Sequence, residues 1–553
     1  AVCNGPVGQP GCCQLQEGWA EGSAAWGDFE DTISSVGFAS LRVFGREGVD
    51  DNTMAFAAGV VEGALTAPRT AQHLNTSLAS EFGGYPALWQ QAEQFLLEND
   101  AYVLDKIKAQ AQDSPYWAQV ALIYAQLDGI LEGHRLAVAA GAQAAPMNRT
   151  GLLFINALVD LSSVVSKPFA GMRPGGLPED PMEWTATEAA VVTDRETHCS
   201  AIVKVAADYS DLWTAHNTWT GFFTMLRAAK LYDLPLAGAA ARKTSFPGYF
   251  GTLGSNDDLF VLSSGLAVQE TTNPVYQPRK KLRTARSILT WARTVLANRM
   301  AKDGKSWTEW FAQENSGTVN NQWMVVDYNR FTPYKPLING TLWVLEQLPG
   351  YVESADLTAY LRNGHWPSFN QPFFPEVRNL SGNDRMAARF GLQYSYDLNP
   401  RAKIFRRDAA AIDSKAQLRR FMRYNDWRND PLCAAGYGGP EEARSPENAI
   451  AARNDLIPSD GTTKAQRAER GVHGNTDGKL ASRDDVLAMR FEFVVGPTHD
   501  DQPPFAWIGE WETLPHEGHP TVFNFTWQMV DLLPPARVEP PRAAAAAADL
   551  LLV

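Results

Sequence analysis

The chain has 553 residues and a formal net charge of −13. This length exceeds what one hydrophobic core usually supports, so it predicts two or more packed units or one large enzyme body. The acidic balance excludes a nucleic-acid partner, which would need clustered Lys and Arg, and the lack of any run of about 18 apolar residues predicts no transmembrane helix.

Residues 1–167 are predicted to form an amino-terminal piece that packs with the remainder. The apolar pattern over residues 37–44 indicates a strand. From residue 85 to about 140, apolar residues recur at steps of three and four, and Pro115 marks a break, so at least two amphipathic helices are expected. This piece supplies packing rather than obvious chemistry.

Residues 168–198 are polar, acidic and contain several Pro and Gly, which predicts an exposed connector. The connector ends at His198, and Cys199 follows at the start of an apolar run. Cleavage between His198 and Cys199 would leave a cysteine that carries both a thiol and a free α-amine.

The remaining residues divide into a catalytic piece, 199–533, and a low-complexity tail, 534–553, in which prolines and an alanine run cannot bury a face. Short apolar runs over 201–206, 260–262 and 323–326 indicate strands, and residues 287–300 indicate a helix. The fold class predicted from these patterns is mixed α and β.

An odd number of cysteines leaves at least one thiol over if the others pair. Cys199 is the candidate for the free thiol. Cys3 is expected to bridge to Cys12 or Cys13, because Gly and Pro allow tight loops there, and both pairings stay open. The five cysteines are Cys3, Cys12, Cys13, Cys199 and Cys433.

Downstream of Cys199, the segments AHNTW and NSGTVNNQW contain side chains that could act as a base or as oxyanion donors for a catalytic thiol. Residues 208–211 form a polar interruption between two apolar runs, which predicts a hairpin that returns His216 and Asn217 towards Cys199. His216 is either a catalytic imidazole or a core histidine, and Asn217 is a candidate oxyanion donor. Asn321 and Asn320 are alternative candidates for a second amide that donates a hydrogen bond to the oxyanion.

Several ordered blocks together resemble the phospholipase B-like proteins, lysosomal and secreted members of the N-terminal nucleophile hydrolases. The blocks are HCSAIVK, AHNTW, DDLFVLSSGLAVQETT, NSGTVNNQWMVVDY, PRAKIFRR, RYNDW followed by DPL, and HGNTDGK. The resemblance implies an α+β fold with four αββα layers, cleavage before the cysteine, and two pieces that stay associated. It also implies that Cys199 is the nucleophile. The sequence lacks the second cysteine that some members carry near Cys433.

A cysteine at a new amino terminus can supply both nucleophile and base. Its α-amine has an unperturbed pKa of about 7.7–8.0 and can take the thiol proton, after which the thiolate attacks a carbonyl and water releases the acyl group. In an acidic compartment an ordinary amine would be protonated, so desolvation or a nearby cation must lower the pKa of the amine.

Three further residues are candidates for substrate contacts. Trp219 and Trp323 are large aromatics that line either a cleft or the core, and core burial is the commoner use of Trp. Thr271 either orients substrate or caps a turn. The expected substrate is a lipid or amide small molecule, and no cofactor is expected.

A metal is not expected, because the histidines at 473, 499, 516 and 519 occur without CxxC, HExxH or a compact carboxylate set. The basic residues 279–281 and 283 form either a solvated face or a surface for transient contact with a membrane. Four charges are too few to anchor the protein alone.

A lysosomal or secreted location is expected. The chain begins at Ala1 rather than Met, which fits removal of a signal peptide, and five N-x-[ST] sequons are candidate glycan acceptors. The sequons stand at Asn75, Asn148, Asn339, Asn379 and Asn524. Two function classes remain: a self-processed acyl hydrolase of esters or amides, and a catalytically silent glycoprotein that uses the same fold for binding or scaffolding.

Overall fold

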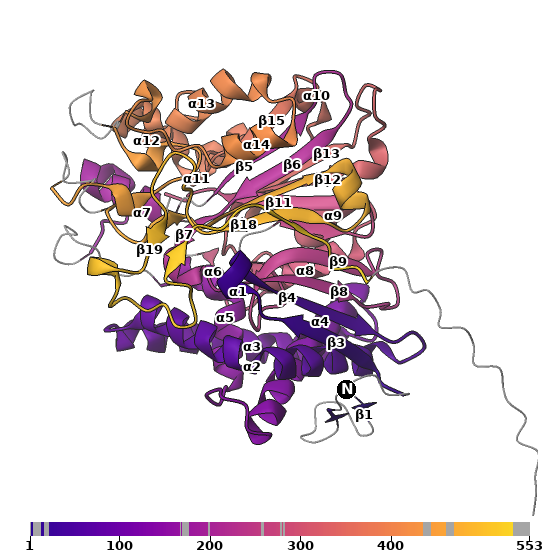
Figure 1. Ribbon diagram of the computed structural model, residues 1–553. Helices are drawn as coiled ribbons and strands as arrows, with labels where there is room; N and C mark the ends of the chain where they lie inside the picture. Colours follow the sequence, from indigo (N-terminus) through magenta and orange to yellow (C-terminus); the bar gives the residue numbers. More distant parts are fainter. Residues whose placement is uncertain are drawn as a thin grey trace, which may run out of the picture.

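The computed structural model has a mixed α and β architecture built around two large sheets (Figure 1). Mixed α and β is the class predicted from the sequence. Of the helices in the described part of the chain, none is long and apolar enough to cross a membrane. The structure describes residues 2–3, 13–15, 22–165, 168, 176–196, 199–255, 259–276, 279, 282–434, 444–460 and 469–534.

The larger sheet has nine strands in the order β14-β13-β12-β11-β10-β9-β8-β4-β3. Its pairs are antiparallel except β4 with β8, which is parallel. Two strands come from the amino-terminal piece, so both pieces build one sheet. The strands are β3 (Ala25–Glu30), β4 (Phe38–Gly45), β8 (Arg227–Asp233), β9 (Lys243–Tyr249), β10 (Leu259–Leu262), β11 (Leu266–Thr272), β12 (Asn321–Asp327), β13 (Leu342–Leu348) and β14 (Tyr351–Asp356).

The smaller sheet has six antiparallel strands in the order β15-β5-β6-β17-β18-β21. These strands are β5 (Ser200–Val205), β6 (Leu212–Asn217), β15 (His365–Ser368), β17 (Asp477–Ser482), β18 (Phe491–Val495) and β21 (Gln528–Val530). Three two-stranded pairs lie outside the large sheets: β1 (Val2–Cys3) with β2 (Cys13–Gln14), β7 (Trp219–Gly221) with β16 (His473–Asn475), and β19 (Phe505–Ala506) with β20 (Val522–Phe523).

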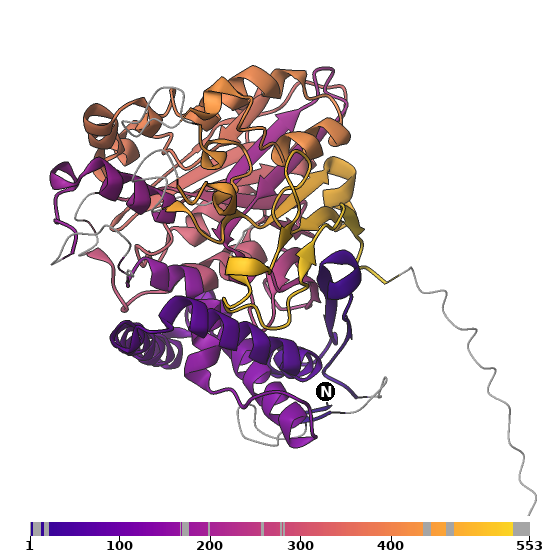
Figure 2. The same ribbon diagram turned by 60° about the vertical axis from the view of Figure 1, so that its left-hand side comes forward.

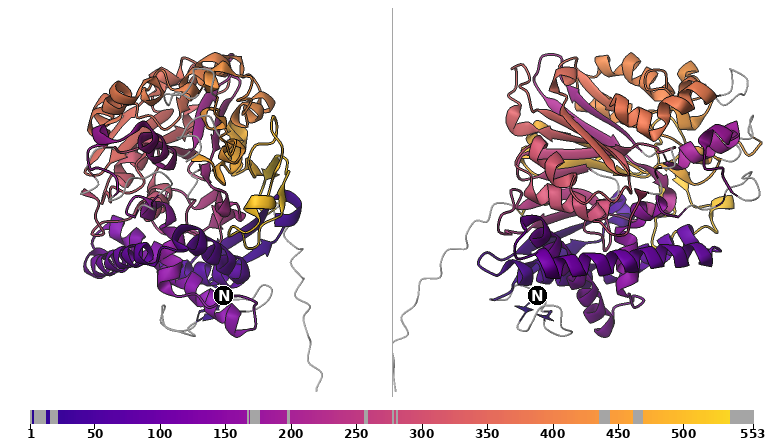
Figure 3. Two further views of the ribbon diagram at one scale, coloured as in Figure 1. Left: turned by 90° about the vertical axis from the view of Figure 1, so that its left-hand side faces the viewer. Right: turned by 180° about the vertical axis from the view of Figure 1, so that it is seen from behind.

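The two sheets face one another, and helices cover both outer faces (Figure 2, Figure 3). Strand alternation explains the layering. In β5, Ala201 and Val203 point to the nine-stranded sheet, whereas Ile202 points to the helices outside. In β12, Met324 faces the six-stranded sheet and Trp323 faces the helices on the other side.

The nine-stranded sheet is covered mainly by helices of the amino-terminal piece, and the six-stranded sheet by two later helices. The first group is α2 (Asp51–Phe82), α3 (Pro86–Gln110), α4 (Pro115–Ala139), α5 (Arg149–Asn156), α6 (Leu158–Ser162), α8 (Thr290–Met300) and α9 (Gly304–Phe311). The second group is α13 (Pro400–Asp408) and α14 (Lys415–Met422). Shorter helices are α1 (Ile33–Val36), α7 (Ala186–Glu196), α10 (Thr358–Leu361), α11 (Pro375–Ser381), α12 (Asn383–Phe390) and α16 (Arg483–Leu487).

The individual elements predicted from sequence patterns are confirmed. Strands β4, β5, β10 and β12, the helices α3 and α4 separated at Pro115, and helix α8 all occur where the patterns indicated. The hairpin is confirmed as β5 and β6, with the turn over residues 208–211. The longest helix, α2, was not predicted.

The described part of segment 168–198, predicted from the sequence to be an exposed connector, is buried in part. Its described part contains α7, and Trp184, Ala189 and Val192 are buried against Tyr276 and the region around α12. The apolar stretch Ala189–Val192 gives this short helix a face to bury. The prediction of an exposed connector rested on the polar composition of the whole segment, in which this stretch does not stand out. His198 lies outside the described residues, as does the tail beyond residue 534.

The amino terminus is described only in its two short strands. The register of β1 with β2 places Cys3 opposite Cys13, and Cys12 lies outside the described residues. A bridge from Cys3 to Cys12 or Cys13 stays a prediction. Cys199 and Cys433 form no disulfide within the described part of the chain, and both are buried.

Helices α2 and α4 cross at van der Waals contact because each carries two glycines four residues apart. A Cβ on Gly63 would lie 2.0 Å from the carbonyl oxygen of Ile130, and a Cβ on Gly133 would lie 2.1 Å from that of Val60. Gly59 and Gly129 are equally constrained. Only hydrogen fits at these positions, so the backbones of the two helices approach closely.

Gly63→Ala and Gly129→Ala should each destabilise the protein by about 1–3 kcal/mol, the usual cost of overpacking a close contact, although Ala is the better helix former. Thermal unfolding measures the effect. The control is Gly471→Ala, where an added Cβ meets nothing within 4 Å. Equal melting temperatures for all three variants would contradict the close helix contact.

Candidate functional site

Cys199 lies immediately before β5, with only 2% of its surface exposed. Its φ of 90° is a left-handed value that costs a non-glycine residue free energy and needs support from its surroundings. Two interactions provide that support. The backbone N–H of Ser200 donates to Asn217 Oδ1 (3.0 Å), and Arg401 Nη1 donates to the carbonyl oxygen of Cys199 (2.7 Å).

The β5–β6 hairpin brings the predicted helpers back to Cys199. Ser200 pairs with Asn217, and Ala201 pairs with His216. Because Ala215 packs against the outer helices, strand alternation directs His216 to the opposite face, towards the nine-stranded sheet. Both His216 and Asn217 are fully buried.

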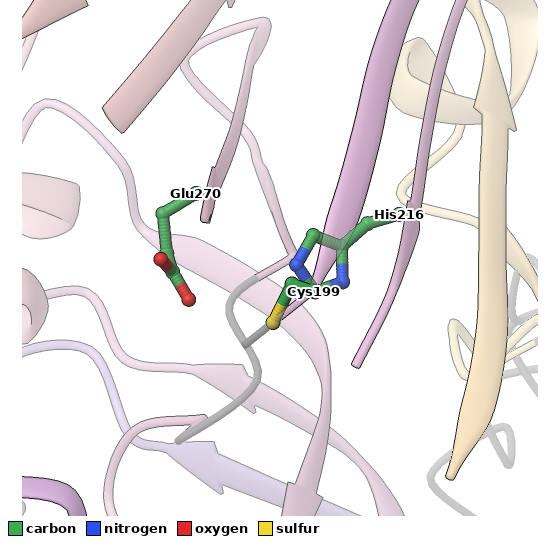
Figure 4. Close-up of side chains that lie close together, drawn as sticks. All are labelled: Cys199, His216 and Glu270. Carbon is green, nitrogen blue, oxygen red and sulfur yellow. The ribbon is translucent and has the colours of Figure 1, made fainter. Parts of the chain in front are cut away.

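A carboxylate from the other sheet joins this pair. Ligand atoms of Cys199, His216 and Glu270 all lie within 4.8 Å of one another, and all three residues are buried (Figure 4). Glu270 belongs to β11, so the cluster spans the interface between the two sheets. Thr271 in this stretch is a predicted substrate contact, whereas Glu270 beside it was not predicted, because a single acidic residue in a strand carries no sequence signal of its own.

His216 is held in its neutral form. Burial lowers its pKa well below 6.5, Lys479 lowers it further, and the nearby Asp477 opposes this only in part. The Glu270 backbone also favours the charged ring, but less than burial disfavours it, and neither ring nitrogen makes a hydrogen bond of good geometry within the described residues. The imidazole can therefore accept a proton from a neighbouring thiol without first losing one.

Three charged side chains beside His216 form a buried network across the sheets. Asp477 Oδ2 accepts from Arg227 Nη1 (2.8 Å) and from Lys479 Nζ (2.8 Å), and all three side chains are 0% exposed. Burial opposes ionisation of Asp477, but Lys479 and Arg227 outweigh it and hold the pKa of Asp477 below its usual value. Two cations against one anion leave a net positive charge, which disfavours a protonated His216.

Asn217 is committed to structural hydrogen bonds. Its Oδ1 accepts from the Ser200 N–H and from Trp219 Nε1 (3.0 Å each). Its Nδ2 donates to the carbonyl oxygens of Met422 (2.6 Å) and Ile450 (3.0 Å). The side chain of Asn217 therefore positions the start of β5, and no N–H remains for an oxyanion.

Asn321 is the better oxyanion candidate of the two. It is fully buried, and neither its amide nitrogen nor its amide oxygen has a hydrogen-bond partner among the described residues. The register of β11 with β12 pairs Asn321 with Thr272 and Trp323 with Glu270. Asn321 is thus two residues from the partner of Glu270, on the same strand face as Trp323, and its role as an oxyanion donor stays a prediction. Asn320, its competitor, donates to the carbonyl oxygen of Gly317.

Two polar residues that the sequence analysis did not single out complete the surroundings of Cys199. Arg401, from α13, donates to the Cys199 carbonyl and to Asn370 Oδ1 (2.7 Å), and it stacks over the Trp219 ring at 4.2 Å. Asn370 in turn donates to the carbonyl oxygen of Thr272 (2.5 Å). The block PRAKIFRR contains Arg401, but nothing in its spacing distinguishes that arginine from its neighbours.

The three predicted substrate contacts are separated by the fold. Trp219 is buried below Arg401, near Cys199. The Thr271 hydroxyl is hydrogen-bonded to Ser368 of the six-stranded sheet (2.6 Å). Trp323 packs in the helix-side core, with ring centroids 5.2 Å from Trp307 and 4.9 Å from Phe311. A substrate role for any of them stays a prediction.

Cys199, His216 and Glu270 offer sulfur, nitrogen and oxygen atoms, a set that zinc can use. The same three groups make a nucleophile, a base and a carboxylate, so their proximity does not require a metal. The expectation that no metal or cofactor takes part stays a prediction.

The predicted glycan acceptors and the predicted membrane contact lie away from Cys199 in the sequence. All five sequon asparagines, at 75, 148, 339, 379 and 524, are exposed, as glycan acceptors must be. Their glycosylation stays a prediction. In the basic stretch, Arg279 and Arg283 donate to the backbone carbonyls of Pro349 and Gly317, and Lys280 and Lys281 lie outside the described residues. Contact with a membrane surface stays a prediction.

Comparison with known proteins gives one consistent result. A family model described as Phospholipase B matches residues 25–530. Phospholipase B-like protein A of Dictyostelium discoideum is 33% identical over 533 residues, which covers 95% of this chain and 91% of that protein. Phospholipase B-like protein C of the same organism is 34% identical over 526 residues (91% and 86%). Phospholipase B-like 1 of Rattus norvegicus is 34% identical over 510 residues (91% and 86%).

The stability of the protein should depend on pH through His216. Its pKa is lowered on folding, so below pH 6.5 the unfolded chain binds a proton that the folded protein excludes, and stability falls as the pH decreases. Replacement by a neutral residue, His216→Gln, removes this dependence. Between pH 7.5 and 5.5 the wild type should lose about 1.4 kcal/mol more than the variant.

Denaturant unfolding of both proteins at the two pH values measures this difference. Comparison within the pair cancels the contributions of other titrating groups, such as His73, whose pKa burial lowers to about 4. An identical pH dependence in the two proteins would mean that His216 takes up its proton in the folded state.

Proposed function

The chain belongs to the phospholipase B family, and from this premise we propose that it is an acyl hydrolase that processes itself before Cys199. The mature Cys199 thiolate then cleaves an ester or amide bond of a lipid-like substrate. The observation that carries the proposal is the buried cluster of Cys199, His216 and Glu270 at the start of β5. A nucleophile, a neutral base and a carboxylate meet at the residue that would become the new amino terminus.

The layers of the fold support the same proposal. Two facing sheets with helices on both outer faces match the αββα sandwich of the N-terminal nucleophile hydrolases. Cys199 directly precedes β5, so cleavage before it would place the thiol and the new α-amine at the start of that strand. The pieces on either side of the cleavage point share the nine-stranded sheet, so they would remain associated after cleavage.

Self-processing begins before any α-amine exists, so another group must accept the thiol proton. His216 fulfils this requirement because it is neutral and close to the Cys199 sulfur. The thiolate attacks the carbonyl carbon of residue 198, the bond from that carbon to the Cys199 nitrogen breaks, and the nitrogen takes up the proton. Water then hydrolyses the resulting thioester, which frees the thiol and leaves a carboxylate on residue 198.

The left-handed backbone at Cys199 favours this step. Its φ of 90° raises the free energy of the precursor locally, and cleavage of the preceding peptide bond relieves the constraint. Arg401 and Asn217 hold the carbonyl and the amide that follow Cys199, so the thiol stays positioned while the bond before it breaks.

In the mature enzyme, the new α-amine and His216 both lie beside the thiol. The base removes the thiol proton, the thiolate attacks the acyl carbon of the substrate, and the leaving group departs with that proton. Asn321 has an uncommitted amide N–H donor for the oxyanion. Water cleaves the thioester and releases the acid. His216 keeps a neutral base available in an acidic compartment, where an ordinary amine would be protonated.

A lysosomal or secreted location fits this chemistry, as do the five exposed sequons. The substrate should combine an acyl chain with an ester or amide bond, and neither bond type is favoured by the groups around Cys199.

Intact-mass analysis and lipid turnover test the proposal together. The wild type, held at acidic pH, should yield a fragment that begins at Cys199 and should hydrolyse at least one of a matched pair of ester and amide lipids. Cys199→Ala should remain uncleaved and lose activity by more than about 100-fold. The control is Cys433→Ala, which removes the second buried thiol, whose pKa burial raises to about 12.

Two results would contradict the proposal. One is a wild-type chain that stays intact and inactive at acidic pH, which would favour the alternative of a catalytically silent binding glycoprotein. The other is a Cys199→Ala variant that is cleaved and active like the wild type.

A second variant isolates the base. His216→Gln should slow cleavage before Cys199 by about 10²–10⁴-fold, the usual contribution of a general base. A time course of precursor disappearance on denaturing gels gives the rate. His73→Gln is the matched control, since His73 is also buried with a lowered pKa but is hydrogen-bonded to the carbonyl of Phe250 in another part of the fold. Cleavage of His216→Gln at the wild-type rate would remove His216 from the mechanism.

A further inference from the structure

A cavity lies on the helix-facing side of the nine-stranded sheet, away from the face that carries the catalytic cluster. It is bounded by β8, β9 and β10 on one side and by α8 on the other. Two polar residues of α8, Asn298 and Arg299, line it together with Tyr232. Most of its wall is apolar, formed by Leu234, Leu236, Phe246, Leu253, Phe260 and Val295.

Arg299 brings a buried positive charge to this cavity. The residue is only 6% exposed, and its Nη2 donates to Gln126 Oε1 of α4 (2.6 Å). Its Nη1 is buried and has no hydrogen-bond partner among the described residues, and no carboxylate of that part of the chain forms an ion pair with Arg299. Burial lowers the pKa of Arg299 to about 10, so the guanidinium stays cationic at neutral and acidic pH.

Another buried arginine on α8 has a hydrogen-bond acceptor for each of its side-chain nitrogens. Arg293 donates from Nε to the carbonyl of Ile288, from Nη1 to that of Phe311, and from Nη2 to Gln347 Oε1. Every nitrogen of that guanidinium has a protein acceptor. The open Nη1 therefore distinguishes Arg299 from Arg293 on the same helix, although Nε of the buried Arg423 also lacks a partner among the described residues.

A second donor is also open in the same cavity. The Asn298 side chain accepts from Trp307 Nε1 through Oδ1 (2.8 Å), which fixes the amide orientation. Its Nδ2 is buried and has no partner among the described residues. Two residues that carry an uncommitted N–H donor, one of them charged, thus line one cavity.

The neighbouring acidic groups are already neutralised. Glu62 accepts from Lys230 Nζ (2.7 Å) and from the Tyr232 hydroxyl (2.6 Å), so its charge is balanced by Lys230. At the rim, Arg242 is paired with Asp233 and Glu47. Among the charged residues at this cavity in the described part of the chain, Arg299 is the one without an ion-pair partner, and an unpaired buried ion is unfavourable.

We propose that this cavity binds a small monovalent anion, chloride or a short carboxylate, through Arg299 Nη1 and Asn298 Nδ2. One bound negative charge neutralises Arg299 and satisfies both donors. Tyr232 and Arg242 also line the cavity, but they already donate to Glu62, Asp233 and Glu47, and most of the remaining wall is apolar, which favours one negative charge over a multiply charged oxyanion such as sulfate. Because Arg299 lies in the catalytic piece and its partner Gln126 in the amino-terminal piece, the anion strengthens the contact between the two.

Thermal unfolding of the full chain tests this proposal independently of catalysis. In sodium gluconate at constant ionic strength, replacement of gluconate by chloride should raise the melting temperature of the wild type saturably, by about 1–4 °C. A parallel titration with acetate distinguishes the two candidate occupants, chloride and a short carboxylate. The anion that raises the melting temperature with the lower half-saturating concentration is the better ligand. Bromide in a crystal of the same protein should give an anomalous peak beside Arg299.

Two variants separate binding from folding. Arg299→Met should lose the chloride response and, in gluconate alone, should melt at or above the wild-type temperature, because it removes an uncompensated charge. Asn298→Asp retains the acceptor for Trp307 and supplies a carboxylate to the cavity, so it should be stable without chloride and insensitive to it. The control Arg330→Met, at a partly exposed arginine paired with Asp327, should respond like the wild type.

The proposal is overturned if Arg299→Met and Asn298→Asp both keep the wild-type chloride response. It is also overturned if the wild type shows no saturable response to either anion, or if bromide does not occupy the cavity. Self-processing and lipid turnover do not enter these readouts, so their failure leaves the anion site unaffected.

Discussion

The buried ion network of Arg227, Asp477 and Lys479 joins the two sheets at the point where the candidate site forms. Arg227 reaches from the nine-stranded sheet to Asp477 of the six-stranded sheet, and its guanidinium stacks at 4.4 Å over the Tyr249 ring. Asp477 also accepts from the Thr218 N–H, which fixes the chain just beyond β6. A buried ion pair repays its desolvation only when its geometry and hydrogen bonds are nearly complete.

The chemistry of the site follows from that network and from the meeting of the sheets. Burial, assisted by the charge of Lys479, lowers the pKa of His216 and keeps its imidazole neutral, and strand alternation directs His216 towards Glu270 of the other sheet. The six-stranded sheet carries Cys199 at the start of β5 and His216 on β6, and the nine-stranded sheet carries the Glu270 carboxylate and the uncommitted amide of Asn321. Neither sheet alone holds a complete set of groups.

Local patterns predicted several elements correctly because the physics behind them is local. The polar turn at residues 208–211 determines the β5–β6 hairpin, and a hairpin determines which residues face each other. Helix α2 escaped prediction because Pro68 lies within it, where a proline normally ends a helix, and because Gly59 and Gly63 weaken the helical pattern. The packing of α2 on α4 offsets both penalties, and such packing is invisible in a single segment.

Roles of individual side chains depended on neighbours that are distant in sequence. Asn217 has the residue type of an oxyanion donor, yet the carbonyls of Met422 and Ile450 occupy its amide. Trp323 lies in the helix-side core because its strand neighbours on both sides set which face it occupies. Arg401 reaches Cys199 from a different layer, and no spacing along the chain connects the two.

The sequence by itself determined the mixed α and β class, the hairpin after Cys199, the free thiol at its start and the resemblance to one family, since these depend on residue order and local pattern. Only the tertiary structure decided that Glu270 and Arg401 belong beside Cys199, that Asn217 is a positioning residue, and that His216 is neutral. Those properties arise from burial and from charges on other strands and helices, which come together only when the sheets pack face to face.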